Sequence, residues 1–260
     1  MLRLGDALAV DSQRDDFIHW SPTRLMLAPD AEDRVDFQYY QMTVAQDGEF
    51  YVGLLHMMQS QEKTFDIFLL TSRDGFQWNW VDRRLPFLGR GEIDSYDAGY
   101  LTPSGPIVHD GRVCIYYGAY SGAHSDELSK LGPNNWTIAL ASLPADRYLG
   151  LLAGPDVGSM ITRPLLFSGS RLKVDMDASL PDQKAETGRG TYDAELRAAL
   201  MDASGGSIEG FGLEQSRTLK ESGVQELSWK GSKLSRLDGR PVRLRFQLRN
   251  AALYSIQFSV

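Results

Sequence analysis

The sequence predicts an all-β protein in which a partial β-propeller is followed by a C-terminal β-sandwich. Short runs of β-forming residues alternate with turn residues along the whole chain. A unit of about 60 residues recurs in the first part, and such a repeat of strand, hairpin and further strands is typical of four-stranded propeller blades. The repeat ends at Gly158. We therefore expect blades over residues 1–158 and a sandwich over residues 159–260.

The first complete blade is expected between residues 37 and 81. Its four strands are predicted at 37–45, 49–58, 64–72 and 76–81. Asp47-Gly48 lies between the first two runs and is a strong hairpin signal. Arg73-Asp74-Gly75 then turns the chain into the fourth strand. This order predicts one antiparallel meander.

The same order recurs further along the chain. A second set of strands is predicted at 100–108, 112–117, 136–142 and 148–151, with His109-Asp110-Gly111 as its hairpin signal. The repeat also extends backward, because residues 7–20 match residues 68–78 and bring Trp20 into register with Trp78. We therefore expect the two outer strands of one blade, followed by two complete blades. The chain is expected to begin in the middle of a blade.

Residues beyond Gly158 lose the turn pattern of the blades and show alternating strands instead. In the run Val242–Leu248, apolar side chains at every second position would face one side of a sheet. Arg243, Arg245 and Gln247 would face the other side. This alternation indicates a strand that is buried on one face only, as in a β-sandwich.

The net charge of the chain limits the classes of partner that it is expected to bind. A net charge of −7 argues against a nucleic-acid partner and against an anionic membrane surface, since either would favour a clustered basic face. Neutral substrates fit better. No apolar run is long enough to span a membrane, and residues 1–10 lack the features of a signal peptide. We expect a cytoplasmic location for the chain as it stands, although a truncated N-terminus would remove any export signal.

Metal and disulfide chemistry are not indicated. Cys114 is the single cysteine, and we expect it to be a buried residue of a strand. The four histidines are scattered and have no cysteine partners at the spacing of a zinc site. We therefore expect neither a metal nor a cofactor.

Three segments together resemble the clan of invertases, inulinases and arabinanases, which includes the family-32-like glycoside hydrolases. The turn Ser72–Trp78 resembles a blade ending of these proteins, and Asp94–Tyr117 resembles one of their later blades. The closing segment from Gly239 to Ser255 is similar to the end of their C-terminal sandwich. The resemblance implies a five-bladed propeller with an attached β-sandwich, of which this chain would be the C-terminal portion.

The resemblance also implies three carboxylates around the centre of the propeller, on the first, second and third blades. Hydrolysis of a glycosidic bond needs paired carboxyl groups, because one protonates the leaving oxygen while the other attacks or activates water. Motifs similar to NDPNG, RDP and a glutamate-cysteine pair would carry these groups, and this chain has none of them. The N-terminal catalytic blades are therefore expected to be missing, and intrinsic hydrolysis is expected to be weak.

Candidate site residues are those at or just before the innermost strand of each blade, where a ligand in a propeller binds. Asp36 lies there, and so does the acidic cluster of Glu92, Asp94 and Asp97, whose close carboxyls would raise one another's pKa. We take Asp36, Asp97 and Glu92 as candidate catalytic residues. The candidate substrate-binding residues are Tyr39, Tyr40, Asp94, Tyr117, Tyr120 and His124. An exposed turn aspartate and a solvated acidic loop are the alternative interpretations of Asp36 and of the cluster.

The predicted function is that of a glycoside hydrolase-like protein that acts on or binds a neutral, possibly furanose-containing oligosaccharide. Two alternatives stay open at this point. A non-catalytic carbohydrate-binding protein would keep the aromatic and acidic lining without turnover. A structural or assembly remnant of a truncated gene would show neither binding nor turnover.

A homodimer is the expected assembly. An open half-ring leaves the apolar face of a blade and an unpaired strand edge exposed, and folded proteins cover such surfaces. Two copies related by a two-fold axis would each complete the other. A sandwich folded over the open face of a monomer is the alternative.

Overall fold

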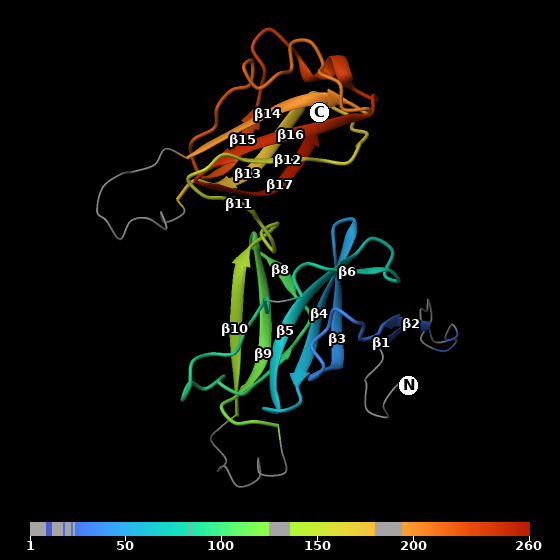
Figure 1. Ribbon diagram of the computed structural model, residues 1–260, viewed down its shortest axis with the longest axis vertical. Coiled ribbons are helices and arrows are strands. Elements are labelled where there is room, and N and C mark those ends of the chain that lie inside the picture. The colour runs from blue at the N-terminus through green and yellow to red at the C-terminus, as the bar shows by residue number, and fades with distance from the viewer. Residues whose placement is uncertain are drawn as a thin grey trace, which may run out of the picture. The chain divides into compact units, whose positions relative to one another are not determined.

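The computed structural model describes residues 9–11, 18, 22, 24–83, 85–124, 136–179 and 194–260. The described elements are β-strands, apart from one short 3-10 helix, η3 (Leu234–Leu237) (Figure 1). The predicted all-β class is confirmed. The chain divides into two compact units, Met1–Ala145 and Asp146–Val260, and each is described by itself.

The first sheet of the first unit is the predicted four-stranded meander. Its strands are β3 (Phe37–Asp47), β4 (Phe50–Gln59), β5 (Thr64–Ser72) and β6 (Trp78–Trp80), and they pair in chain order with antiparallel neighbours. The turn before β6 is built by Asp74, whose carboxylate accepts hydrogen bonds from the backbone N–H groups of Phe76 and Gln77, both at 2.8 Å. Asp74 and Gly75 therefore form the turn that the sequence predicts before the fourth strand.

The N-terminal strand pair includes a strand that the sequence did not predict. β1 (Ala9–Asp11) lies within the predicted run and pairs with β2 (Arg24–Leu27). The predicted second strand, residues 16–20, lies outside the described residues apart from Ile18. Leu27 packs against the core of the first sheet, and the guanidinium of Arg24 lies 5.0 Å from the ring centre of Phe76. These apolar and stacking contacts favour residues 24–27 as the strand. Trp20 lies outside the described residues.

The second sheet of the first unit is narrower than predicted. It contains β7 (Tyr100–Pro103), β8 (Ile107–His109), β9 (Arg112–Tyr120) and β10 (Trp136–Pro144), and both β7 and β8 pair with β9. The predicted strand 100–108 is broken because Pro103 and Pro106 have no N–H to donate to the ladder. The prediction of a fourth strand at 148–151 is wrong for this sheet: β11 (Leu151–Ala153) pairs with a strand of the second unit.

The second unit is a two-sheet sandwich. One sheet has the order β11–β17–β13–β15 and the other the order β12–β16–β14. The remaining strands are β12 (Gly158–Ile161), β13 (Arg171–Asp177), β14 (Glu195–Asp202), β15 (Gly223–Leu227), β16 (Val242–Arg249) and β17 (Ala251–Ser259). Side chains from both sheets form one core, and the predicted alternation of β16 is confirmed, since its apolar residues are buried.

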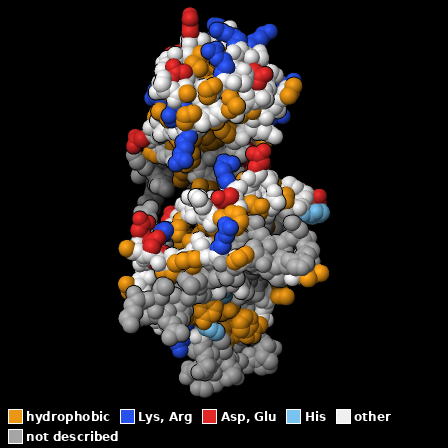
Figure 2. All heavy atoms as spheres, turned by 90° about the vertical axis from the view of Figure 1, so that its right-hand side faces the viewer, with side chains coloured by type: hydrophobic (Ala, Val, Ile, Leu, Met, Phe, Trp, Pro, Cys, Tyr) orange, Lys and Arg blue, Asp and Glu red, His pale blue; other side chains and the backbone are white. Residues whose placement is uncertain are grey.

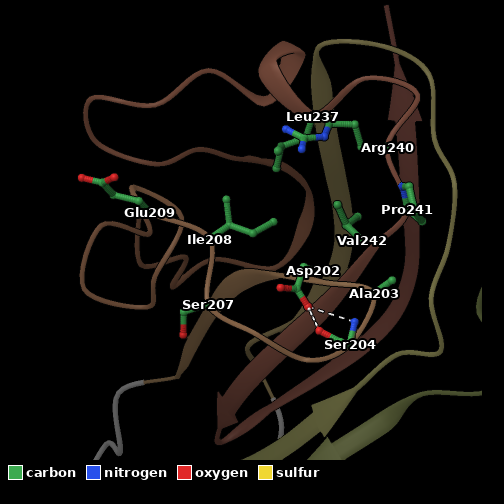
Figure 3. Close-up of a pocket in the computed structure, with 10 residues that line it drawn as sticks. All are labelled: Asp202, Ala203, Ser204, Ser207, Ile208, Glu209, Leu237, Arg240, Pro241 and Val242. Atoms are coloured by element: carbon green, nitrogen blue, oxygen red, sulfur yellow. Dashed lines mark hydrogen bonds between the residues drawn. The ribbon is translucent and has the colours of Figure 1, made fainter.

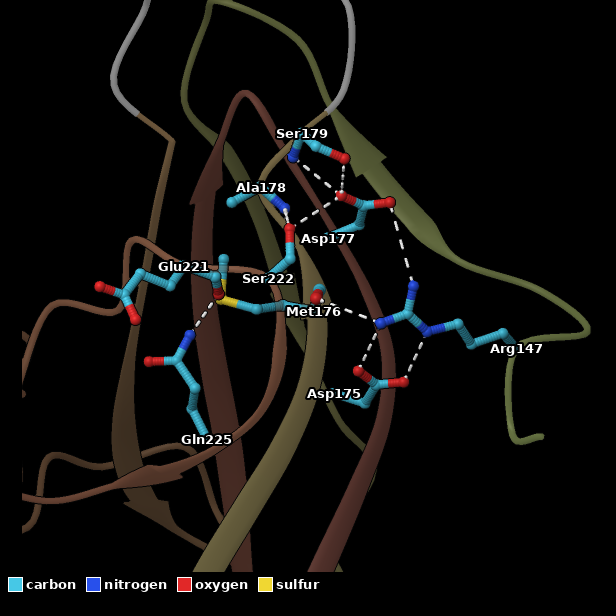
Figure 4. A network of polar contacts seen from close by, with 9 residues as sticks. All are labelled: Arg147, Asp175, Met176, Asp177, Ala178, Ser179, Glu221, Ser222 and Gln225. Atoms are coloured by element: carbon cyan, nitrogen blue, oxygen red, sulfur yellow. Dashed lines mark hydrogen bonds and ion pairs between the residues drawn. The ribbon is translucent and has the colours of Figure 1, made fainter. Parts of the chain in front are cut away.

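An arginine near the start of the second unit ties the chain to the sandwich (Figure 4). Arg147 donates two hydrogen bonds of 2.7 Å to the carboxylate of Asp175 and lies 3.9 Å from Asp177. Its guanidinium also stacks on Tyr254 at 4.6 Å. These contacts, together with the pairing of β11, place residues 146–158 in the second unit, whereas the repeat predicts the boundary after residue 158.

One face of the β9–β10 pair is apolar and open to solvent. Tyr116, Trp136, Ile138 and Leu140 lie on this face and are 48–79% exposed, since Tyr116 is opposite Leu140 in the register and the other three occupy alternate positions of β10. Hydrophobic side chains reach the surface of the first unit in several patches (lower part of Figure 2). The open blade face expected from the sequence is thus present. The homodimer that would cover it stays a prediction.

Gly53 tests the packing of the first sheet. A methyl group at this β4 position would lie 2.6 Å from the Trp78 ring and 2.7 Å from Met42 Sδ. We expect Gly53→Ala to lower the free energy of unfolding by about 1–3 kcal/mol, as overpacked cores do. Chemical denaturation followed by circular dichroism measures this. Gly118→Ala in β9 is the control, because its methyl group would meet only Thr102, at 4.0 Å. Equal effects of both substitutions would contradict the packing described.

Candidate functional site

The predicted site residues lie at one end of the first unit, which we call the rim and define as residues 34–40, 59–66, 90–100 and 117–124. Backbone hydrogen bonds join these segments: Ser60 N to Asp36 O (2.7 Å), His124 N to Lys63 O (2.6 Å), Phe65 N to Gly99 O (2.9 Å) and Gly99 N to Tyr120 O (3.1 Å). Segments far apart in the sequence are therefore held together by the main chain, and their side chains share one surface region.

Asp36 forms an ion pair at the rim. Arg34 donates to both of its carboxylate oxygens, from Nε at 3.2 Å and from Nη2 at 3.0 Å. Two parallel bonds of this kind fix the orientation of the carboxylate and occupy both of its oxygens. The side chain of Asp36 is nearly buried. This environment suits a structural carboxylate better than a proton donor.

Tyr39 belongs to the core and not to a ligand surface. Its side chain is 1% exposed, and its hydroxyl donates to Asp33 at 2.7 Å. Burial, followed by this hydrogen bond, raises the pKa of the Tyr39 hydroxyl. Tyr40, the next residue, points to the opposite side of the strand and is partly exposed.

A buried carboxylate that the sequence interpretation missed lies beside the rim. Asp66 accepts hydrogen bonds from Gln59 Nε2 and from the backbone N–H of Arg90, both at 2.9 Å, and from Arg90 Nε at 3.3 Å. It stands in an apolar β5 run between Phe65 and Ile67. A carboxylate at such a position must find a partner, and this is the signal that would have found it.

Asp97 has a different environment, because hydroxyl groups hold it. Ser95 Oγ donates to it at 2.7 Å and the Tyr117 hydroxyl at 3.3 Å. The Tyr96 hydroxyl lies 3.2 Å from that of Tyr117, and it donates to Tyr117 because the Tyr117 proton is already used. Burial and the bond to Tyr96 raise the pKa of Tyr117. A side chain at Gly91 would displace the Asp97 carboxylate or the Ser95 hydroxyl from this position.

The predicted acidic cluster is only partly assembled. Glu92 and Asp94 lie in the same loop as Asp97, but both side chains are exposed. Asp94 has a φ of 73°, which an aspartate tolerates better than most residues do. Asp97 alone of the three joins the hydroxyl network described above.

Aromatic rings and two histidines fill the space beside these carboxylates. The ring of His56 lies 4.3 Å from Phe65 and 5.1 Å from Tyr100, and His124 lies 5.7 Å from Tyr40. The Tyr40 hydroxyl is 3.3 Å from His124 Nε2, within hydrogen-bond distance. The structure therefore brings together two predicted binding residues, Tyr40 of β3 and His124 of the loop after β9.

Tyr120, another predicted binding residue, is buried at the end of β9. Its ring stacks on Trp136 at 4.6 Å with an angle of 22° between the planes. Trp136 is itself more than half exposed. The buried ring of Tyr120 thus packs against the ring of Trp136, and of these two rings that of Trp136 is accessible to solvent.

His56 is fully enclosed by this cluster. Its side chain is 1% exposed, and its Nε2 has no hydrogen-bond partner among the described residues. Burial, and then the nearby His124, lower the pKa of His56 to about 4. The imidazole is therefore neutral near pH 7 and serves as a packing residue, as one expects for a histidine in an apolar strand.

Among the described residues, hollows are found away from the rim. One of about 760 Å³ runs along β6 and is lined by Glu32, Trp78, Asn79, Trp80, Val81, Asp82 and Arg83. The other, of about 610 Å³, lies in the second unit (Figure 3), where Arg240 and Asp202 stand on opposite sides of Val242 and Ile208. Neither hollow contains a site residue predicted from the sequence.

The described ranges contain no group of three or more His, Cys, Asp or Glu side chains that could hold a metal ion. Within the same ranges, no helix has the length and apolar character needed to cross a membrane.

Comparison with known proteins does not assign a family. No family model and no curated protein sequence matches the chain. Similar solved structures include an N-acetylgalactosamine deacetylase from F. plautii in complex with blood group B trisaccharide, at 17% identity and a TM-score of 0.41. That match covers 52% of this chain, which spans only 40% of the deacetylase.

Other matches extend over most of the chain. The Bombyx mori GH32 β-fructofuranosidase BmSUC1 has 9% identity and a TM-score of 0.31, with 92% of this chain and 70% of that one covered. Sucrose-6-phosphate hydrolase from Lactobacillus gasseri has 10% identity and a TM-score of 0.28, with 94% and 71% covered. Similarity at this level supports no conclusion about activity.

The enclosure of His56 predicts acid sensitivity. The unfolded chain binds a proton at this histidine below about pH 6.5, whereas the folded chain does so only near pH 4. Stability should therefore fall as the pH drops through this window, by about 3 kcal/mol for this residue. Denaturant titrations between pH 7 and pH 4 measure the effect.

The variant His56→Phe should flatten that pH dependence, because phenylalanine fills a similar volume and does not titrate. His109, which is exposed, provides the control: His109→Gln should leave the slope unchanged. If His56→Phe kept the full loss of stability between pH 6.5 and pH 4, other groups would be responsible.

Proposed function

We propose that this chain binds a neutral carbohydrate at the rim. The observation that carries the proposal is the environment of Asp97, a partly exposed carboxylate whose hydrogen-bond donors are the hydroxyls of Ser95 and Tyr117. Exposed tyrosine rings accompany it, with Tyr96 in the same network and Tyr40 beside His124. Binding sites of this kind combine a few well-placed polar groups with aromatic surface.

The chemistry of a sugar matches these groups. Sugar hydroxyls can donate to the free lone pairs of the Asp97 carboxylate, which has more acceptor capacity than its two donors use. The apolar C–H faces of a sugar ring can pack on tyrosine, whose ring is apolar and whose hydroxyl is polar. The exposed Glu92 and Asp94 in the same loop favour a neutral ligand, because they repel anions.

The arrangement supports binding better than hydrolysis. The sequence resemblance implies a furanose-active glycoside hydrolase, whose reaction requires one carboxylic acid and one carboxylate on either side of the scissile bond. Asp36 and Asp66 are each paired with a guanidinium group, which already occupies their acceptor oxygens. Asp97 is then the rim carboxylate best placed to meet a ligand, and a single carboxylate does not complete the reaction.

Asp97→Asn is the test. Asparagine has nearly the same shape: its one oxygen can still accept from Ser95, and its amide nitrogen can donate to the Tyr117 hydroxyl, so the fold should persist with little change in melting temperature. Loss of a charge-assisted hydrogen bond should weaken sugar binding by about tenfold or more. Isothermal titration with sucrose, inulin oligosaccharides and arabino-oligosaccharides measures the affinity.

Asp94→Asn, an exposed substitution in the same loop, is the matched control and should bind as the unmodified chain does. Unchanged affinity in the Asp97→Asn variant, or a large loss of stability with binding intact, would make Asp97 a structural residue. A reducing-sugar assay on the same samples tests turnover. Robust hydrolysis that Asp97→Asn abolishes would replace binding by a glycoside hydrolase function.

A further inference from the structure

The outward face of the β12–β16–β14 sheet carries a row of arginines. Arg243, Arg245 and Arg249 occupy alternate positions of β16, with Gln247 between the last two. The register places Arg197 of β14 opposite Gln247, so a fourth guanidinium joins the same face. The sequence shows only the alternation along one strand, and the pairing with β14 adds the rest.

This face has more positive charge than its own carboxylates can neutralise. Glu195 is the acidic residue among the described outward positions of these three strands. It accepts from Arg249 at 2.8 Å and from Arg197 at 3.4 Å. Arg243 donates to neutral backbone carbonyls of Ala203 and Thr162 instead. The four guanidinium groups of this face thus have one carboxylate among them, which two of them contact, in a chain whose net charge is −7.

The donors on this face also outnumber the acceptors. The Nε groups of Arg197, Arg245 and Arg249 have no hydrogen-bond partner among the described residues. Each guanidinium carries five N–H donors, and donors left without acceptors are uncommon in folded proteins. The side chains of Arg197 and Arg249 are 43% and 39% exposed, so a ligand can reach their outer nitrogens.

We propose that this arginine face binds an acidic polysaccharide, a chain of sugar residues that carry carboxylate groups. Alternate residues of a strand lie about 6.6–6.8 Å apart, so Arg245 follows Arg243 after one such interval and Arg249 follows after two more on the same face. Guanidinium groups bind carboxylates through two parallel hydrogen bonds. Gln247 and Ser159, paired across the strands, are neutral polar side chains that can bond sugar hydroxyls.

Other polyanions fit this face less well. Single-stranded nucleic acid is bound by aromatic rings that stack on the bases, and the outward positions between the arginines hold the aliphatic Ile161, Ala199 and Met201. An acidic protein partner would need large anchors such as Trp or Tyr at the centre of its interface. A flexible acidic sugar chain needs only charge and hydroxyl contacts, which the face provides.

The test is a titration of the full chain with a galacturonate hexamer at low salt. The fully methyl-esterified hexamer is the matched ligand, since it has the same backbone and no charge. We expect the acid form to bind at least about tenfold more tightly and to lose affinity as salt is raised. Equal affinity for the two hexamers, or tighter binding of a single-stranded oligonucleotide, would overturn the proposal.

Arg245→Gln is the variant that locates the site. No described hydrogen bond or ion pair of the Arg245 side chain is lost, so the fold should be retained, as the melting temperature will show. Affinity for the acid hexamer should fall by about tenfold. Arg217→Gln, an exposed arginine of the same unit outside this face, should have no effect. Unchanged binding in Arg245→Gln would also overturn the proposal.

This proposal does not depend on the function proposed for the rim. Asp97→Asn should leave binding of the acid hexamer unchanged, and Arg245→Gln should leave binding of the neutral sugars unchanged. Failure of one site is therefore visible separately from failure of the other.

Discussion

The backbone hydrogen bond from Phe65 N to Gly99 O is the contact on which the first unit depends, because it joins its two sheets at the rim. Gly99 in turn donates to Tyr120, so both sheets and the loop that carries Asp97 share one main-chain connection. A side chain at position 99 would collide with the backbone of Gly122, which is why the approach needs glycine. The aromatic rings around His56 then fill the space that this close approach creates. The geometry of the rim is therefore set by these backbone hydrogen bonds, and the side chains pack around them.

Charge is distributed unevenly between the described faces, although the chain as a whole is acidic. Exposed carboxylates gather in the loop around Asp97, whereas guanidinium groups gather on the outward face of β16. Such separation gives each face its own ligand preference, because electrostatic attraction and repulsion between exposed groups act over about 10 Å at moderate salt. Net charge alone therefore describes neither site.

Local signals predicted the fold well where turns and alternation are strong. Asp47-Gly48 and the turn at Asp74 predicted the first meander, and the alternation of Val242–Leu248 predicted β16. Register and long-range pairing could not be predicted in the same way. The partner of Leu151–Ala153 is β17, about a hundred residues later, and no local pattern identifies it.

The same limit applies to the site. Tyr39 and Tyr40 are equivalent in the sequence, and only the direction of the strand decides which one is buried, with an irregularity at this point of β3 shifting the register. Asp66 lies within an apolar run of the sequence, and that run predicts a strand without indicating which groups bind the carboxylate. The open apolar face of β9 and β10 has a practical consequence for handling the protein. Dyes that fluoresce on apolar surface, commonly used to follow unfolding, would bind the native chain at Tyr116, Trp136, Ile138 and Leu140, so melting curves need a dye-free readout.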